Sequence, residues 1–448
     1  MQKFPKVLVI SHNPFSKTQN NGKTLASFFS GWPNSDLIQL FLTLDEIDTD
    51  ICSSFFRISD VDVLKAWLFK RHDYGVSLNK SNISQFNLDK SKMHQSKFYV
   101  FIRDLFQKRY PLMMLCRNYV WNRVKPWQNE VLNDWLDINK PDIIFFQSSN
   151  VYAIFDMVDY ISCKLNIPVI METTDDYLST RFSLSIFKYI NIYKMRKRYK
   201  KMVRKAYCTF VIGDAMKMEY ENKFPGRYEV ALNSINISEK VTNYKYKKNN
   251  IVFVYAGNLG LNRWKVLSKI GTALHQIREK HGINSRLDIY SANVPNKKFQ
   301  NIINTNQHIN FCGKVSPDEL IEIKNSADFL VHVESFDKKN VEITRLSIST
   351  KIPEYLVSNR CIVAVGPEQV ASIKYLKENN IAFVINDCKK IENRIFELLC
   401  DQKQIQKYID NGINIAKERH DCNKNSKLIQ KYIINGVKES GGKSEKSK

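Results

Sequence analysis

The chain has 448 residues, of which 43% are hydrophobic and 25% are charged, and its formal net charge is +23. This length and composition predict a globular protein with two domains and exclude a disordered chain. The nine cysteines are scattered without a C-x-x-C pair, which excludes a disulfide framework and indicates reduced thiols. The dispersed cysteines and histidines predict no metal site, and no apolar run reaches about 18 residues, so we expect a cytoplasmic protein without a membrane-spanning helix.

The first half of the chain begins like a parallel α/β domain. Residues 7–10 predict a strand, followed by a polar loop and a helical segment at 23–29. Three further strands are predicted in this half, at 142–146, 168–171 and 209–212. Residues 60–135 are rich in aromatic side chains and less regular, and they predict a helical insertion in the first domain.

The second half repeats this pattern. A strand at 251–255 precedes a loop with two glycines and a helical run at 266–280. Four further strands are predicted in this half, at 287–290, 310–311, 329–333 and 361–365. Short β-rich runs followed by helices of 3.6-residue period indicate βα units in both halves.

Two Rossmann-like, doubly wound domains are therefore the predicted architecture. The first spans residues 1–232, and the second spans residues 233–425. The polar segment from 233 to 250 is the expected hinge. Residues 426–448 are expected to form a C-terminal helix and a tail that is disordered from residue 436.

The loop after the predicted strand 251–255 has the residue types of a phosphate site. Gly257, Asn258 and Gly260 lie between a strand and a helix, where backbone amides can approach a phosphate closely. Arg263 and Lys265 add positive charge, and the arginine fork suits phosphate oxygens. A tight turn with two glycines is common, so this segment alone is a weak signal.

A second segment, STKIPEYL, strengthens the phosphate interpretation. Ser349 or Thr350 is suited to cap a helix that begins here, which would leave the amides of Lys351 and Ile352 free at its positive end. Glu354 falls one turn further on, where a carboxylate could accept bonds from two neighbouring hydroxyls, such as those of a ribose. A capped helix with an acidic first turn is the alternative reading.

The order of the segments resembles a known family. Read together, GNLGLNRWK, FCGKVSPDEL (with Ser316 capping a helix), HVESF, STKIPEYL and NRCIVAVGP look like the donor domain of retaining, family-4-type (group 1) GT-B glycosyltransferases. The resemblance covers roughly residues 1–30 and 140–430. It implies two domains that face a cleft, a nucleoside-diphosphate sugar as donor substrate, a glycan or lipid-linked acceptor, and neither cofactor nor metal.

The family pattern also assigns roles to residues. Arg263 and Lys265 would hold the donor diphosphate, with the glycine loop around it, and Glu354 would bind the ribose. The backbone from Gly313 to Val315 would meet the base.

The chain departs from the family pattern at two positions. Leu346 stands eight residues before Glu354, where the family has a glutamate; Glu334 has a similar strand-end context, and Glu342 is a weaker alternative. At the end of the strand 142–146, Gln147 stands where the family often has a histidine. Gln147 and Glu334 are thus weak candidates for a catalytic residue, and the sequence assigns no general base.

A basic segment at 181–205 has ten lysines and arginines and no acidic residue. It is interpreted either as a solvated helix packed on its own domain or as a surface helix attracted to anionic lipid on the inner face of the membrane. Nucleic acid is the third reading, but no reader motif accompanies the charge, so no nucleic-acid partner is expected.

The leading hypothesis is a hexosyl or related transferase of surface polysaccharide biosynthesis. A GT-B-fold nucleotide-sugar epimerase and a basic nucleic-acid-binding α/β protein are the alternatives. The epimerase would need a more complete set of acid and base residues than the sequence offers. The sugar, the base and the acceptor are not specified by the sequence.

Overall fold

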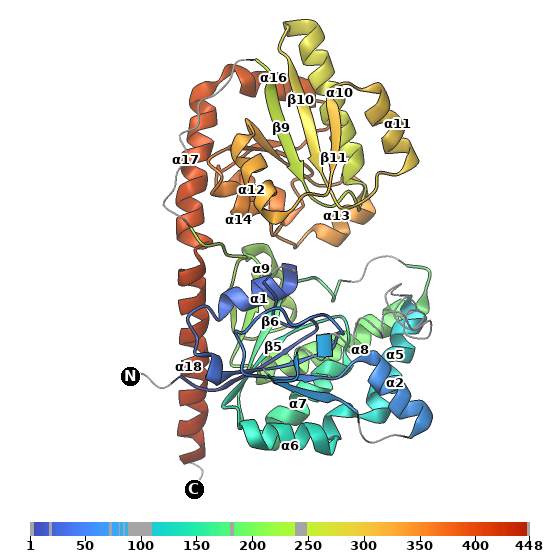
Figure 1. Ribbon diagram of the computed structural model, residues 1–448, viewed down its shortest axis with the longest axis vertical. Coiled ribbons are helices and arrows are strands. Elements are labelled where there is room, and N and C mark those ends of the chain that lie inside the picture. The colour runs from blue at the N-terminus through green and yellow to red at the C-terminus, as the bar shows by residue number, and fades with distance from the viewer. Residues whose placement is uncertain are drawn as a thin grey trace. The chain divides into compact units, whose positions relative to one another are not determined.

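The computed structural model describes residues 4–17, 20–70, 74–79, 81–83, 86–87, 110–179, 183–237 and 249–445. The chain forms two compact units: unit 1 comprises Met1–Ala231 and Asn423–Lys448, and unit 2 comprises Leu232–Cys422. Each unit is built on one β-sheet with helices on its two faces (Figure 1). Residues 238–248 of the predicted hinge and 88–109 of the predicted insertion lie outside the described residues.

The sheet of unit 1 has eight strands in the order β4-β3-β2-β1-β5-β6-β7-β8. The pair β3 and β4 is antiparallel and the other pairs are parallel. The strands are β1 (Val7–Ser11), β2 (Leu37–Phe41), β3 (Ser54–Arg57), β4 (Val76–Asn79), β5 (Ile143–Gln147), β6 (Val169–Thr173), β7 (Cys208–Val211) and β8 (Tyr228–Val230). The strand order reverses between β1 and β5, which places a topological switch point there.

The central strands of unit 1 are apolar on both faces because helices cover both. The helices of the unit are α1 (Asn20–Phe28), α2 (Asp60–Phe69), α5 (Pro111–Val124), α6 (Glu130–Asn139), α7 (Ala153–Leu165), α8 (Ile186–Lys205), α9 (Asp214–Lys223) and α18 (Cys422–Glu445). On one face, Phe28 of α1 shares a core with Phe145 of β5. On the other face, Phe155 of α7 packs against Phe146 of β5 at 5.0 Å between ring centroids.

Helix α18 is the last element of the chain but belongs to unit 1. Its Ile429 and Ile433 are fully buried in the core that includes Val9 of β1 and Phe145 of β5. The expectation of a disordered tail from residue 436 is wrong as far as Glu445, because the helix continues to that residue. Gly436 lets the helix lie against the sheet, since a Cβ at this position would come within 3.2 Å of Ile143.

The sheet of unit 2 has six strands, all paired in parallel, in the order β11-β10-β9-β12-β13-β14. The strands are β9 (Ile251–Ala256), β10 (Ser285–Tyr290), β11 (Ile309–Gly313), β12 (Phe329–Val333), β13 (Cys361–Val365) and β14 (Phe383–Ile385). The helices are α10 (Arg263–His281), α11 (Lys297–Thr305), α12 (Pro317–Ser326), α13 (Lys338–Thr344), α14 (Ile352–Leu356), α15 (Ala371–Glu378), α16 (Ile391–Cys400) and α17 (Gln402–Arg419). Unit 1 also has two short 3-10 helices, Asn34–Asp36 and Pro126–Gln128.

The structure confirms the predicted fold class, two doubly wound α/β domains with helices α2, α5 and α6 in the region of the predicted insertion. The predicted cap at Ser316 is also confirmed: its hydroxyl accepts from the amide of Glu319, and Pro317 begins α12. Strands β2, β3, β4, β8 and β14 were not predicted. None of the helices in the described ranges combines the length and hydrophobicity needed to cross a bilayer.

The burial of α18 in unit 1 leads to a stability prediction. Truncating Ile429 to alanine removes a fully buried side chain and should destabilise unit 1 by about 2–5 kcal/mol. Lys431→Ala, at an exposed position on the same helix, should have little effect. Chemical denaturation followed by circular dichroism measures both variants, and equal midpoints for the two would contradict the placement of α18 in the core.

Candidate functional site

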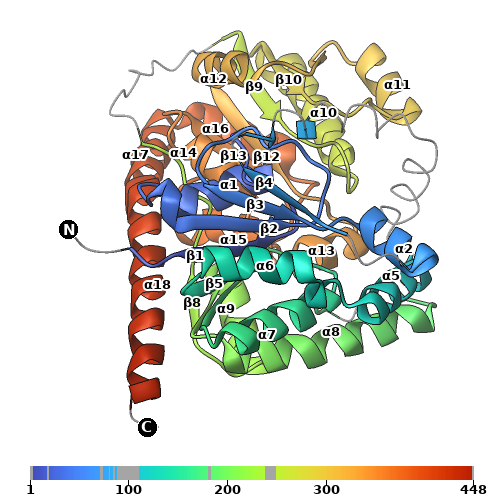
Figure 2. The same cartoon turned by 60° about the horizontal axis from the view of Figure 1, so that its bottom comes forward.

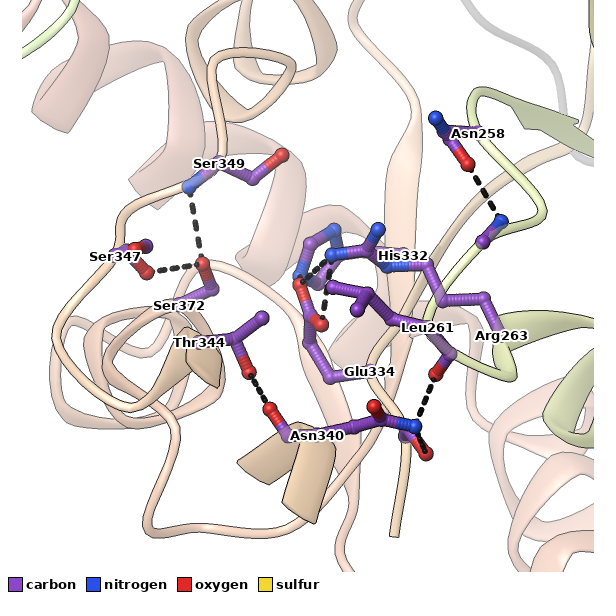
Figure 3. A network of polar contacts seen from close by, with 12 residues as sticks. Asn258, Leu261, Arg263, His332, Glu334, Asn340, Thr344, Ser347, Ser349 and Ser372 are labelled. Carbon is purple, nitrogen blue, oxygen red and sulfur yellow. Dashed lines mark hydrogen bonds and ion pairs between the residues drawn. The ribbon is translucent and has the colours of Figure 1, made fainter. Parts of the chain in front are cut away.

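A cluster of buried and half-buried charged side chains in unit 2 lies at the carboxyl ends of β9 and β12. These two strands pair at the centre of the sheet, where the order of the strands reverses. Ligands of open α/β sheets bind at such a switch point, outside the carboxyl ends of the strands. The start of α10, the residue after β12 and the residue before α14 contribute the charged side chains of this cluster. Figure 3 shows two of them, Arg263 and Glu334.

The loop after β9 is held by hydrogen bonds to the end of β10 and the segment after it, and by one bond within the loop. The amide of Gly257 donates to the carbonyl of Tyr290 at 2.9 Å, and the amide of Leu259 donates to Oδ1 of Asn293 at 3.2 Å. The amide of Gly260 donates to Oδ1 of Asn258. These three amides have partners within the protein, and the expectation that the loop lies around a phosphate stays a prediction.

Arg263 begins α10 and pairs with Glu334, the first residue after β12. Its Nη2 lies 3.0 Å and 3.2 Å from the two carboxylate oxygens. Glu334 is 3% exposed, so this is a buried ion pair. Burial raises the pKa of Glu334, while the nearby Arg263 and Lys351 favour its ionised form. Figure 3 shows the guanidinium directed at this carboxylate.

His332 of β12 lies beside the same carboxylate. Burial lowers its pKa to about 3, and the positive charges of Lys351 and Arg263 add to this effect. The imidazole is therefore neutral, and its Nε2, 3.7 Å from Glu334, forms no ion pair at neutral pH. Among the described residues this Nε2 has no hydrogen-bond partner.

Lys351 extends from the start of α14 across to the loop after β9. Its Nζ lies 4.8 Å from the centroid of the Tyr255 ring, within the range of a cation–π contact. A Cβ on Gly257 would lie 1.6 Å from this Nζ, so only glycine leaves room for it. Burial lowers the pKa of Lys351 to about 8, with a contribution from Arg263.

Lys265 lies further out on α10 and pairs with Asp337 at 3.2 Å. The same carboxylate accepts from Asn262 at 2.6 Å, and these bonds hold its pKa below the ordinary value. In α13, Asn340 donates to the carbonyl of Leu261 at 2.8 Å. The segment 337–346, which separates Glu334 from the position of the family glutamate, thus braces the loop after β9.

The start of α14 differs from the sequence expectation. The residue before the helix is Lys351, with no side-chain cap, instead of Ser349 or Thr350. The amide of Ile352 donates to the carbonyl of Ser349 at 3.2 Å, and that of Lys351 to the Ser349 hydroxyl at 3.4 Å. Neither amide is free, because the preceding turn satisfies them, and the expected anion site of open helix amides is not formed.

Glu354 is half-buried and has a partner that the sequence did not indicate. Its Oε2 accepts from Nζ of Lys324 at 2.8 Å, and Lys324 is itself buried. Gly313 and Val315 lie at and beyond the end of β11, two strands along the sheet from β9. The structure therefore groups Arg263, Glu334 and Lys351 closely, with Glu354 and the β11 loop at the sides.

Gln147, the other weak catalytic candidate, belongs to unit 1. It ends β5, and its Nε2 donates to Glu172 of β6 at 2.9 Å. Burial raises the pKa of Glu172 to about 7 despite this bond. The pair is therefore a buried polar contact between adjacent strands, in which Glu172 titrates near neutrality. No cluster of three or more metal-ligating side chains occurs among the residues that the structure describes.

Comparison with known proteins supports the fold. No family model matches the sequence, and a search of curated proteins finds no match. Solved structures match over almost the whole chain. The Anabaena protein HepE in complex with UDP and glucose is 12% identical, with a TM-score of 0.59, over 96% of this chain and 100% of that chain.

Two further structures match to the same extent. Sucrose-phosphate synthase from Thermosynechococcus elongatus is 10% identical, with a TM-score of 0.59, over 96% of this chain and 98% of that chain. The α,α-trehalose 6-phosphate synthase from Burkholderia multivorans is 9% identical, with a TM-score of 0.59, over 99% and 100%. The chain therefore has the two-domain GT-B fold.

The lowered pKa of Lys351 leads to a pH prediction. Burial disfavours the charged amine, so Lys351 is cationic below a pH of about 8 and loses its proton above it. The affinity of an anion bound beside this amine, with UDP as the probe, should therefore fall as the pH rises through 8, by at most about tenfold per pH unit for one linked proton. Lys351→Met should bind the probe more weakly and without this dependence. Titration calorimetry measures both, and an unchanged pH profile in the methionine variant would contradict the assignment.

Proposed function

We propose that the protein is a glycosyltransferase that transfers a sugar from a nucleoside-diphosphate sugar to a glycan or lipid-linked acceptor. The observation that best supports this is the convergence of Arg263, Lys351 and buried Glu334 at the switch point of unit 2. Two cations at the carboxyl edge of a parallel sheet suit a diphosphate. HepE, which shares the fold, has been solved with UDP and with UDP-glucose.

In this proposal the side chains, and not open backbone amides, hold the diphosphate. Arg263 and Lys351 are the inner cations, and Lys265 is the outer one. Because Arg263 is paired with Glu334, an incoming phosphate would share the guanidinium with that carboxylate, whose pKa burial already raises. Because Gly257 and Gly260 have no side chains, the donor could come close to the backbone of the loop after β9.

The remaining donor contacts follow the sequence prediction. Glu354, oriented by Lys324, would accept bonds from the two ribose hydroxyls. Gly313 and Val315 would lie beside the base, and Asn258, Ser349 and Thr350 would line the phosphate region. A donor that extends from β9 toward β11 could reach both the ribose and base positions.

Transfer is proposed to proceed with retention of configuration. The leaving diphosphate then helps to deprotonate the acceptor hydroxyl on the same face of the sugar, and the protein contributes mainly positioning and stabilisation of charge. Glu334 is proposed to contact the transferred sugar. Leu346 occupies the position eight residues before Glu354, where the family that the sequence resembles has a glutamate. Gln147 remains a weak candidate in unit 1. Three cations near the diphosphate can replace a divalent ion, so we propose a metal-independent reaction in surface polysaccharide biosynthesis.

A double variant tests the phosphate assignment. Arg263→Ala alone would leave buried Glu334 without its partner, at a cost of about 3–5 kcal/mol, so this single variant would combine a loss of stability with any loss of binding. Arg263→Ala/Glu334→Ala removes both charges together. It should weaken UDP binding by about 1.5–3 kcal/mol, measured by titration calorimetry in EDTA.

The matched control is Lys280→Ala/Glu392→Ala, which removes another ion pair of α10, with a distance of 2.6 Å. The control should bind UDP like the original protein. Equal affinity in both double variants would show that Arg263 does not hold the phosphates. Loss of all binding in EDTA, restored by Mn²⁺, would contradict metal independence.

We also propose that unit 1 attaches peripherally to an anionic membrane, on its cytoplasmic face. Helix α8 packs on its own unit with one face, which has Met195, Tyr199 and Met202 buried. Its opposite face is basic. Lys197, Lys200 and Arg204 are exposed and form no ion pair within the described part of the chain.

Exposed apolar side chains accompany this basic face. Helices α2, α5 and α8 lie side by side (Figure 1 and Figure 2), and α5 contacts both of the others. Leu184, before α8, is 95% exposed, and Ile186 and Tyr193 are exposed on the helix. Phe69, at the end of α2, is also exposed. Apolar side chains beside free cations fit an anionic lipid surface better than they fit nucleic acid.

A charge variant tests this attachment. Lys197→Gln/Lys200→Gln/Arg204→Gln should weaken binding to anionic liposomes by about 1 kcal/mol per charge, since each basic residue near such a surface contributes that much. The control Lys403→Gln/Lys407→Gln/Lys417→Gln removes three exposed charges from α17 and should bind normally. Co-sedimentation at increasing salt measures both. Equal binding to neutral liposomes would contradict the proposal.

A further inference from the structure

A histidine interrupts a buried strand of unit 2. Strand β12 lies inside the sheet between β9 and β13, where a parallel strand is expected to be apolar along its whole length. His332 of this strand is 4% exposed, and its Nε2 is buried without a hydrogen-bond partner among the residues that the structure describes. A buried polar group without a partner is costly, so the histidine at this position needs an explanation.

The carboxylate of Glu334 lies beside this nitrogen. The amide of Glu334 donates to the carbonyl of Val365 at 2.9 Å and so continues the pairing of β12 with β13. Because side chains alternate along an extended strand, His332 and Glu334 point to the same face of the sheet. Nε2 lies 3.7 Å from Oε1 of Glu334, which is too long for a hydrogen bond by somewhat less than about 1 Å. Figure 3 shows both side chains together with Arg263.

The neutral imidazole has one hydrogen to donate. Burial, together with the positive charges of Lys351 and Arg263, keeps the ring of His332 uncharged, so one ring nitrogen carries a hydrogen and the other a lone pair. A lone pair on Nε2 would face the carboxylate of Glu334, and the two would repel each other. The tautomer with the hydrogen on Nε2 is therefore favoured, and this N–H can donate to Glu334.

Glu334 has one donor in the structure. Both of its oxygens accept from Nη2 of Arg263, at 3.2 and 3.0 Å, and no other hydrogen bond to this carboxylate occurs in the described ranges. Lys351 favours the ionised form of Glu334, but its Nζ lies over the ring of Tyr255, and no ion pair joins it to Glu334 in the described part of the chain. Among these residues, Arg263 alone donates to the carboxylate.

An anion at this site would compete for that donor. In the proposed function, Arg263 and Lys351 bind the donor diphosphate. Only Nη2 of the guanidinium reaches Glu334, so a rotation that presents the guanidinium to a phosphate withdraws this contact. The carboxylate is 3% exposed, so water has little access to replace the lost bonds. Glu334 then needs another donor from the protein.

The packing around both side chains favours His332 as that donor. The ring of His332 is carried by an inner strand, in register with Ala364 of β13. Gly366 lies against the stem of Glu334, since a Cβ at Gly366 would lie 3.0 Å from the Cβ of Glu334. The main chain of both residues is thus fixed, and a rotation of the Glu334 side chain could shorten the distance of 3.7 Å to that of a hydrogen bond.

We propose that His332 is a positioning residue: when an anion engages Arg263, the Nε2–H of His332 donates to Glu334 and holds this carboxylate in place. The inference rests on the proposed binding of the donor diphosphate at Arg263. It explains the unpaired nitrogen, whose partner is present but engaged by the guanidinium. Glu334, which is proposed to contact the transferred sugar, keeps a partner while Arg263 binds phosphate.

Titration calorimetry with UDP, together with thermal melting of the ligand-free protein, tests this exchange of partners. His332→Phe keeps a planar ring but has no donor, so it should weaken UDP binding by about threefold or more. Its melting temperature should not fall, because the nitrogen that it removes has no partner without the ligand. His332→Gln restores a donor and should bind UDP within about twofold of the original protein.

The matched control is His308→Phe. His308 is also a buried histidine of unit 2 with an unpaired Nε2, but it precedes β11 at the amino end of that strand. This variant should leave the affinity for UDP within about twofold, even if the lost bond from Nδ1 to the carbonyl of Ser285 lowers the melting temperature. An unchanged affinity for UDP in His332→Phe, or an equal loss of affinity in His332→Gln, would overturn the inference.

A ligand-free comparison separates this inference from the proposed function. Arg263→Ala removes the present partner of Glu334 without any anion. In this background His332→Phe should lower the melting temperature by about 2–4 °C, whereas in the original background it should not. Equal effects of His332→Phe in the two backgrounds would overturn the inference even if the protein binds UDP. If Arg263→Ala does not fold, the UDP measurements decide.

The opposite result is also informative. A protein that binds no UDP, but in which His332→Phe destabilises only the Arg263→Ala background, would support the role of His332 at Glu334. The same result would contradict the proposed donor site.

Discussion

The buried ion pair between Arg263 and Glu334 is the interaction on which the arrangement of unit 2 most depends. It joins the start of α10 to the end of β12 with two contacts of 3.0 and 3.2 Å. A carboxylate this deep is costly to bury without its partner. The same two charges influence their neighbours: Arg263 helps to lower the pKa of Lys351 and of His332, while Glu334 opposes the shift at Lys351.

Strands that are apolar along their whole length could be predicted from the sequence. Cys361–Val365 has the predicted bounds, because a strand buried on both faces is a continuous apolar run. Phe329–Val333 also has them, with one buried histidine, His332, in an otherwise apolar run. Strand β2, Leu37–Phe41, was missed since Gln39 interrupts its run. That side chain is fully buried, and it donates to Ser11 and accepts from the amide of Phe15. These hydrogen bonds offset the burial of a polar side chain. They come from tertiary contacts, which leave no pattern in the local sequence.

The types of residue at the site were more predictable than their partners. Arg263 could be selected because it follows a glycine-bearing loop at a strand end, and Lys351 and Glu354 because they lie at the start of a predicted helix. The sequence did not indicate that Arg263 pairs with a residue 71 positions away, or that Lys324 holds Glu354 across 30 positions. The open amides were wrongly expected because turn geometry decides which backbone groups are already bonded, and residue type specifies that geometry poorly.

The place of α18 has a consequence for biosynthesis. Unit 2 is one continuous stretch, Leu232–Cys422, whereas unit 1 needs the helix that follows it. When synthesis has passed residue 231, all strands of the unit 1 sheet have been made, but one face of this sheet still lacks Ile429 and Ile433. Unit 2 can complete its core first, although domains generally fold in order from the N-terminus. The earlier half of the protein is therefore finished last, and its apolar face stays uncovered while the other unit is made.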